Sequence, residues 1–163
     1  MPDRPLDLVI KNVRVVRPRR PQVERLDLGV QDGRFARIAP DIPAAAARAV
    51  YDARARLGFP GVVDAHTHVG IYGPLAEDAV SESRAAVSGG VTTMLTYFRT
   101  GQYYLNRGGA YAEFFPEVLE QSAGRYHCDY GYHLAPIAGS HVGEMELLAT
   151  QHGVPSFKIF MFS

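Results

Sequence analysis

Apolar runs alternate with helix-like periods along the second part of the chain. The runs predict strands at about residues 61–68, 91–98, 130–137 and 155–162, with helices between them at about 76–88, 111–123 and 141–152. Strand, helix and strand in this rhythm imply right-handed crossovers and a parallel sheet. The pattern therefore predicts an α/β domain over residues 57–163.

The first part of the chain has a different pattern. Short alternating segments predict strands near residues 6–16, 26–31 and 34–39, with a turn at Asp32-Gly33. Residues 43–56 read as a connection that carries one short strand, at 49–53. We therefore expect residues 1–56 to form a small β domain ahead of the α/β domain.

Charge and composition exclude several classes of partner. The net charge is formally zero, although residues 1–60 carry twelve basic and seven acidic side chains and residues 61–163 carry five and ten. The basic cluster at 17–20 is interrupted by proline and lacks interleaved aromatic residues, so it predicts a solvated turn and no nucleic-acid partner. One cysteine, Cys128, excludes an internal disulfide. With no signal sequence and no long apolar stretch, we expect a cytoplasmic protein without a membrane partner.

Two histidines at the end of the first predicted strand of the α/β domain suggest a metal site. His66 and His68 are two residues apart, and the period of a strand points both imidazoles to the same side. A bare His-x-His also occurs by chance, with the histidines as hydrogen-bonded core residues. Asp64 is in phase with both, where it can support a metal-bound imidazole or serve as a plain turn or capping residue.

A lysine in the last predicted strand is the second unusual feature. Lys158 lies within an apolar run, where a charge is costly, and the chain has fifteen arginines but only two lysines. A desolvated lysine has a neutral, nucleophilic amine, which arginine cannot supply. Such an amine can take up carbon dioxide, and the resulting carbamate can bridge two divalent ions. The alternative is an edge-strand lysine that reaches water and limits aggregation.

These motifs resemble a known family. Residues 60–68 (Pro-Gly-Val-Val-Asp-Ala-His-Thr-His) and 156–161 (Ser-Phe-Lys-Ile-Phe-Met) look like the amidohydrolase superfamily, specifically its hydantoinase and dihydropyrimidinase branch. Residues 8–16 and 32–38 are similar to the N-terminal strands of the same enzymes. The resemblance implies the N-terminal part of a TIM-type (β/α)8 barrel, preceded by strands of a small β-sandwich domain.

The resemblance also implies a chemistry: metal-dependent hydrolysis of a cyclic amide C–N bond of the hydantoin or dihydropyrimidine type. His66 and His68 would hold one of two divalent ions, and carboxylated Lys158 would bridge both as the catalytic centre. Zinc is the expected ion, and manganese or iron suits the same ligands. The family's two further histidines and its catalytic aspartate would lie beyond Ser163, so we expect an N-terminal fragment that is inactive alone.

Loops after the strands of such barrels form the active-site wall. On this basis Tyr72, Arg99 and His141 are candidate substrate contacts, although Arg99 also suits a surface ion pair, and His141 also suits a capping residue or one that supports another side chain. His127, His133 and His152 are assigned to packing, strand and helix-end positions. The family usually has a tyrosine five residues past the bridging lysine, where this chain has Ser163. The substrate therefore stays open among hydantoin, dihydropyrimidine, allantoin, dihydroorotate and other lactams.

Two alternatives to an enzyme stay open as well. Neuronal relatives of dihydropyrimidinase are nonenzymatic assembly proteins that have lost metal ligands, and the fragment can also be inert. Retention of His66, His68 and Lys158 argues for the enzyme. We expect a homo-oligomer when the protein is full length, acting on a small cyclic amide.

Overall fold

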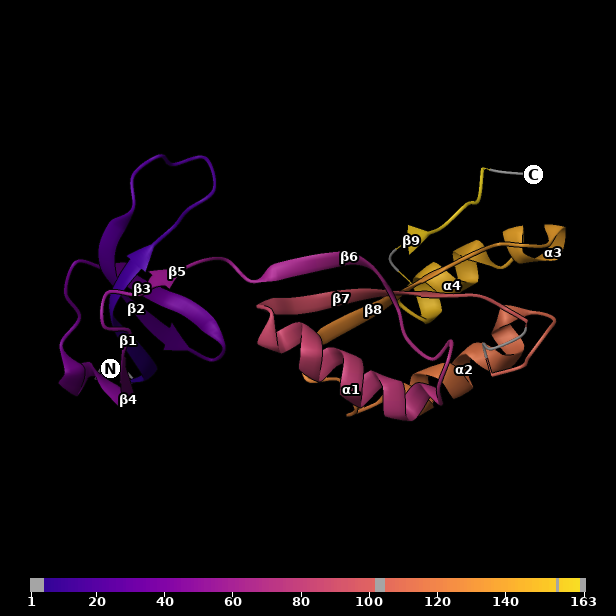
Figure 1. Ribbon diagram of the computed structural model, residues 1–163, viewed down its shortest axis with the longest axis horizontal. Coiled ribbons are helices and arrows are strands. Elements are labelled where there is room, and N and C mark those ends of the chain that lie inside the picture. Colours follow the sequence, from indigo (N-terminus) through magenta and orange to yellow (C-terminus); the bar gives the residue numbers. More distant parts are fainter. Residues whose placement is uncertain (1–4, 102–104, 155, 162–163) are drawn as a thin grey trace. The chain divides into compact units, whose positions relative to one another are not determined.

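The chain folds into two compact units, with the boundary after Pro60. The computed structural model describes residues 5–101, 105–154 and 156–161 (Figure 1). The sequence suggested a boundary after residue 56. Strand β5 (Leu57–Gly58), which was not predicted, pairs with the first strand of the chain, and its residues therefore belong to the first unit.

The first unit is a five-stranded sheet with the order β3-β2-β1-β4, and β5 also pairs with β1. Its other strands are β1 (Leu6–Val15), β2 (Glu24–Gln31), β3 (Arg34–Ala39) and β4 (Ala47–Asp52), and the 3-10 turn η1 (Ala44–Ala46) precedes β4. Strands β2 and β4 each begin two residues before their predicted starts. Asp32 and Gly33 both have positive φ, which suits the tight hairpin between β2 and β3.

A lysine fastens a loop over one face of this sheet. Lys11 Nζ donates to Asp41 Oδ1 at 2.6 Å and to the Ile42 carbonyl at 2.8 Å, and it also pairs with buried Asp27. Asp27 in turn accepts the N–H of Ile42 at 2.9 Å. Of the two lysines in the chain, Lys11 therefore has a structural role, which is to hold this loop against the sheet.

The second unit has the predicted strand and helix alternation. Four parallel strands have the order β6-β7-β8-β9. The elements are β6 (Val62–His68), α1 (Leu75–Ser88), β7 (Val91–Phe98), α2 (Tyr111–Ser122), β8 (Asp129–Leu134), α3 (Gly139–Val142), α4 (Met145–Gln151) and β9 (Ser156–Phe157). Strand β7 has the predicted bounds, and α1 and α2 differ from theirs by one residue. Among the described residues, no helix is long and apolar enough to cross a membrane.

Three predictions for the second unit were wrong in extent. Strand β8 ends at Leu134 and not at Ile137, because Pro136 has no N–H to donate to a ladder. The helix predicted at 141–152 is two helices, broken at Gly143 and Glu144. The break lets the Glu144 carboxylate accept the first N–H groups of α2, from Tyr111 at 2.9 Å and Ala112 at 2.8 Å.

The strand predicted at 155–162 is also shorter. Strand β9 covers only Ser156 and Phe157, and residues 155 and 162 lie outside the described residues. The N–H of Lys158 still donates to the Leu134 carbonyl at 2.9 Å. Ile159 and Met161 are 73% and 98% exposed. The described residues after Lys158 form no ladder.

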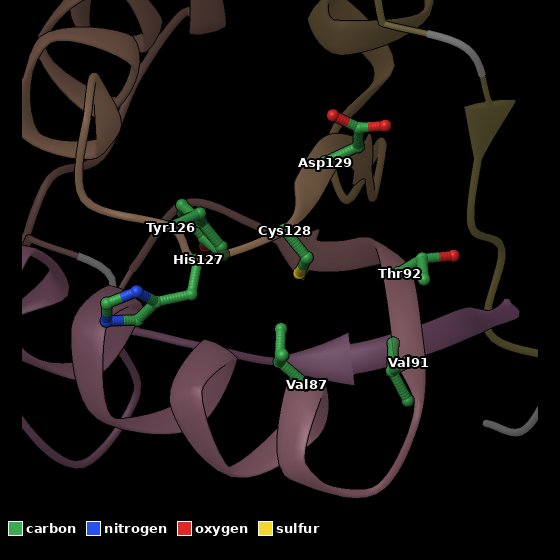
Figure 2. Close-up of a pocket in the computed structure, with 7 residues that line it drawn as sticks. All are labelled: Val87, Val91, Thr92, Tyr126, His127, Cys128 and Asp129. Carbon is green, nitrogen blue, oxygen red and sulfur yellow. The ribbon is translucent and has the colours of Figure 1, made fainter. Parts of the chain in front are cut away.

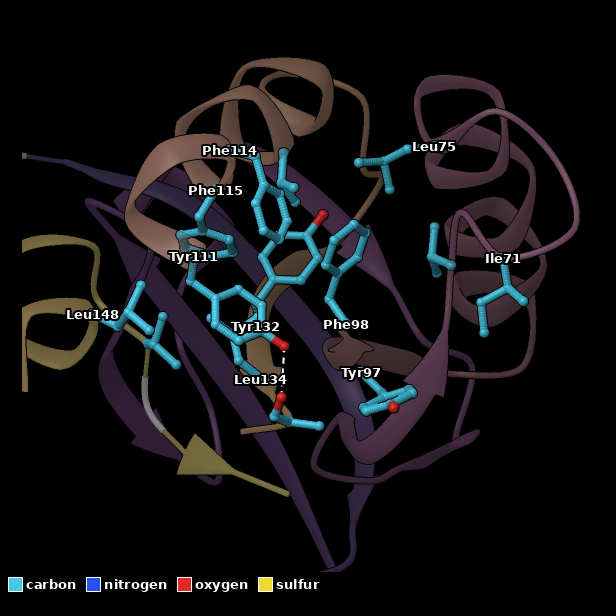
Figure 3. Packing of buried hydrophobic residues seen from close by; sticks show 14 of the residues in the cluster. Ile71, Leu75, Tyr97, Phe98, Tyr111, Phe114, Phe115, Tyr132, Leu134 and Leu148 are labelled. Carbon is cyan, nitrogen blue, oxygen red and sulfur yellow. Dashed lines mark hydrogen bonds between the residues drawn. The ribbon is translucent and has the colours of Figure 1, made fainter. Parts of the chain in front are cut away.

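One hydrophobic core joins the helices to the sheet of the second unit. Figure 1 shows α1 and α2 along the same side of β6, β7 and β8. Figure 3 shows aromatic side chains of α2 meeting those of β7 and β8. The largest fully buried members on the helix side are Tyr111, Phe98, Phe115, Leu75, Leu134 and Leu148, whereas the buried Tyr97 lies on the opposite face of β7. This packing fixes the strands whose other face carries the candidate site.

Candidate functional site

The candidate site lies at the C-terminal ends of the four parallel strands. His68, Tyr97, His133 and Ser156 are paired in register across β6, β7, β8 and β9, so they form one row on one face of the sheet. His66 is two residues before His68, and Lys158 is two residues after Ser156. The contacts of His66 with His68 and of Lys158 with His66 place both on the same face as the row.

Three nitrogen atoms meet at His66. Its Nε2 lies 3.0 Å from His68 Nε2, and Lys158 Nζ donates to the same Nε2 at 3.1 Å. These distances confirm the predicted convergence of the two histidines with the lysine, although 92 residues separate Lys158 from His66. One lone pair on His66 Nε2 cannot accept two full hydrogen bonds. Hydrogen bonding alone therefore does not account for the approach of both His68 and Lys158 to this atom, which is expected of groups that share one bound cation.

A β-bulge sets the direction of His66. Asp64 pairs with Met94 and Thr67 pairs with Thr96, so β6 has one more residue in this interval than β7. The bulge removes His66 from the regular ladder, and its N–H instead donates to Asp64 Oδ1 at 3.1 Å. Of the two roles open to Asp64, the contact seen is the local one, to the backbone of the residue that carries the imidazole.

The electrostatics of the site favour neutral imidazoles. Desolvation lowers the pKa of His66, His68 and His133, and the nearby Lys158 ammonium lowers all three further. As whole residues His66 and His68 are solvent-exposed, but their Nε2 atoms face one another, and His66 Nε2 also faces Lys158. Desolvation and positive charge act in the same direction, so the three rings stay neutral near pH 7, the form in which imidazole binds a metal.

Two aromatic rings support the lysine. Lys158 Nζ lies 4.7 Å from the ring centres of Tyr97 and Phe160, within the range of a cation–π contact. The Tyr97 ring is 2% exposed and also lies against the rings of His66 and His68. Tyr97 therefore forms the floor under the candidate ligands, a role that the sequence did not suggest.

His133 was assigned to an ordinary strand position, and the structure places it beside the candidate ligands. Its Nε2 lies 2.8 Å from His66 Nδ1, on the side of the ring away from Lys158. The side chain is 9% exposed. The alternation within one strand gave no signal for this contact, because it depends on the register between β8 and its neighbours.

The three candidate substrate residues follow β6, β7 and β8 in turn. Tyr72 is 92% exposed in the loop after β6, where it lines a hollow with Leu105 and Asn106. Arg99 follows β7 and is half-buried. Burial raises the pKa of the Tyr111 hydroxyl, and the charge of Arg99 is among the groups that oppose this rise.

His141 has structural contacts, in line with the supporting role that the sequence left open beside a substrate contact. It is 3% exposed, its Nδ1 accepts the N–H of Ile137 at 3.2 Å, and its Nε2 lies 3.0 Å from the Gly109 carbonyl. Because Nδ1 accepts, the ring proton is on Nε2, which donates to Gly109. Both nitrogens are therefore used to join two loops.

A separate hollow lies at the opposite ends of the strands. Figure 2 shows its lining, which comprises Val87, Val91, Thr92, Tyr126, His127, Cys128 and Asp129, around a volume of about 440 Å³. These residues precede β7 and β8 or begin them, whereas the histidine cluster lies at the C-terminal ends of the parallel strands. Burial raises the pKa of the Cys128 thiol, so it is not an activated thiolate. His152 packs against the ring of Phe115.

The donors present fit a divalent metal. Two imidazole nitrogens on one zinc ion at about 2.0–2.1 Å stand roughly 3.3 Å apart in tetrahedral geometry, close to the 3.0 Å between His66 Nε2 and His68 Nε2. In the part of the chain that the structure describes, no three His, Cys, Asp or Glu side chains are arranged to hold an ion. The pair therefore needs Lys158 and further ligands to complete a site.

Comparison with known proteins agrees with this geometry. The chain is 32% identical to a D-hydantoinase of Ralstonia pickettii and to dihydropyrimidinase 2 of Caenorhabditis elegans. Each alignment covers 96% of this chain, and it covers 33% of the first protein and 30% of the second. An L-hydantoinase (dihydropyrimidinase) from Arthrobacter aurescens has a similar structure, with a TM-score of 0.77 and 25% identity over 97% of this chain and 34% of that one. No family model matches the chain.

The parallel α/β sheet, with paired histidines at the end of its first strand and a lysine after its fourth, defines an amidohydrolase-type barrel segment. More particularly, the chain belongs to the hydantoinase and dihydropyrimidinase branch of that superfamily, which confirms the resemblance seen in the sequence. The chain spans about a third of the length of these relatives.

Proposed function

We propose that the intact protein is a metal-dependent hydrolase that opens a small cyclic amide of the hydantoin or dihydropyrimidine type. The observation that carries the proposal is the approach of His68 Nε2 and Lys158 Nζ to His66 Nε2, at 3.0 and 3.1 Å. The names of the relatives support the same chemistry. An assembly protein that had lost its metal would have no need for this cluster.

In this proposal His66 and His68 hold one divalent ion through their Nε2 atoms. Lys158, carboxylated on Nζ, would be the catalytic group that helps to hold this ion and a second one. Relatives in the superfamily are generally binuclear-metal enzymes, which supports two ions. Zinc suits the imidazole and carboxylate-like oxygen ligands, and manganese or iron suits them as well. The bound ions supply Lewis acidity, which polarises the ring carbonyl and acidifies the attacking water.

The remaining residues of the chain orient these groups. Asp64 holds the bulge that directs His66, and Tyr97 with Phe160 supports the arm of Lys158 from below. The proton for the leaving nitrogen must come from a further group, because His66, His68 and Lys158 are all used as ligands. Arg99 and Tyr72 are proposed to contact the substrate from the loops after β7 and β6.

We also propose that the first unit is half of a β-sandwich. One face of its sheet is covered by the loop that Lys11 fastens. Register places a second set of apolar side chains on the other face: Leu8, Ile10, Leu28, Val30, Phe35, Ile38 and Tyr51. Phe35 is 65% exposed and Tyr51 is 52% exposed, so this face has room for a second sheet. A cytoplasmic location and a homo-oligomeric state stay predictions.

The test is to measure bound metal and ring opening of hydantoin and 5,6-dihydrouracil by the intact protein. His66→Asn and Lys158→Arg should each remove most of the metal and abolish ring opening. The first removes an imidazole ligand, and the second introduces a guanidinium group, which cannot be carboxylated. Lys158→Ala should regain part of the activity when a short carboxylic acid is added. His127→Asn, at the other end of the strands, is the matched control. Normal metal content and rate in Lys158→Arg would show that the lysine is structural.

A further inference from the structure

A second imidazole stands behind His66. His133 Nε2 lies 2.8 Å from His66 Nδ1, and the two ring centres are 4.7 Å apart at 66°. Strand β8 is paired on both sides at this point, with Tyr97 in β7 and with Ser156 in β9. The His133 backbone is therefore fixed by two ladders, and its ring is 9% exposed.

The positions of the protons follow from the partners of the two rings. His66 Nε2 faces His68 and the Lys158 ammonium, and an ammonium group can only donate. His66 Nε2 must therefore carry the lone pair, which leaves the ring proton on Nδ1. That proton points at His133 Nε2, which must accept it, so the His133 proton lies on its own Nδ1.

We propose that His133 is a positioning residue that fixes His66 in the tautomer with a proton on Nδ1 and holds its ring so that Nε2 faces the ion. The inference rests on the proposed metal site, because it assigns His66 as a ligand. A metal-binding histidine usually donates its other N–H to a fixed acceptor, most often a carboxylate, a backbone carbonyl or water. Here the acceptor is a neutral imidazole.

Two substitutions of nearly equal size separate this role from packing. In His133→Gln the side-chain Oε1 can occupy the place of Nε2 and accept the His66 proton, whereas His133→Met fills the same space without a strong acceptor. If His133 only packs, methionine should be tolerated at this buried position at least as well as glutamine. If His133 accepts the proton, glutamine should be tolerated better than methionine.

The first measurement is the zinc dissociation constant of the intact protein, by competition with a chromophoric chelator. We expect His133→Met to weaken binding by about 10- to 100-fold, the usual effect of losing such a partner, and His133→Gln to stay within about threefold of the original. His127→Gln and His127→Met are the matched controls and should bind as the original does. Equal affinities for the two His133 variants, whether both high or both low, would overturn the proposal.

The second measurement does not need the metal. With ¹⁵N-labelled histidine, the metal-free protein should show His66 in the Nδ1–H tautomer in the original and in His133→Gln, and a tautomer mixture in His133→Met. A His66 ring that keeps one tautomer in all three proteins would refute the role of His133. A protein that binds no zinc but shows the expected tautomers would refute the proposed function and leave the positioning role intact.

Discussion

Substituting Gly61 with alanine tests how the strand that carries both histidines is seated. A Cβ at Gly61 would lie 2.7 Å from Thr92 Cβ and still closer to Thr92 Oγ1 and Cγ2. Rotation of the threonine moves Oγ1 and Cγ2 but not its Cβ, so the backbone of β6 or β7 must shift. Overpacking of this kind costs about 1–3 kcal/mol. We expect Gly61→Ala to lower the free energy of unfolding by this amount.

The assay is urea unfolding of the intact protein, followed by circular dichroism. Gly108→Ala is the matched control, because a Cβ there meets nothing within 4 Å. Thr92→Gly removes the side chain that clashes, so the double variant Gly61→Ala/Thr92→Gly should show a favourable coupling energy of about 1–3 kcal/mol. An unchanged midpoint in Gly61→Ala, or a double variant in which the two effects simply add, would refute the reasoning.

Three further outcomes follow from the structure. The metal-free protein should lose stability as the pH falls below 6.5, the ordinary histidine pKa, until the lowered pKa values of His66, His68 and His133 are passed. The reason is that the unfolded state binds more protons than the folded state wherever folding lowers a histidine pKa. Unfolding free energies from pH 8 to 5 check this, and a flat profile would contradict it. Asp64→Ala should cost about 1 kcal/mol, since the His66 N–H loses its acceptor at the bulge, and Asp64→Asn should cost less; equal urea midpoints for the two would count against the bulge argument. Residues 1–163 expressed alone should aggregate and lack ring-opening activity, because Ile159 and Met161 are exposed; a monodisperse, active product by light scattering and assay would show otherwise.

Hydrophobic periodicity and residue type predicted the helices and strands whose bounds depend on their own sequence. The β-branched and aromatic run predicted the bounds of β7, and the period of two put His66 and His68 on one face. The break at Gly143 was missed because its cause is tertiary: Glu144 is needed at the start of α2. Strand β9 was overestimated because an apolar, aromatic run forms a ladder only where a neighbouring strand pairs with it.

The candidate site shows the same division. His66, His68 and Lys158 could be predicted because each departs from the pattern of its own strand. His133 and Tyr97 could not, since they reach the cluster through the register of β7 and β8 with their neighbours. The role of His141 could not be decided from the sequence, because its position after a strand resembles that of a substrate contact, whereas in the structure both its nitrogens bind backbone groups.

The central claim is that Lys158 becomes a carbamate that joins two ions held beside His66 and His68. The most direct measurement is the ¹³C NMR spectrum of the intact protein, loaded with zinc in ¹³C-bicarbonate. The account predicts one carbamate carbon resonance per chain together with two bound ions, and the loss of that resonance in Lys158→Arg. Two tightly bound ions without a carbamate signal would contradict it.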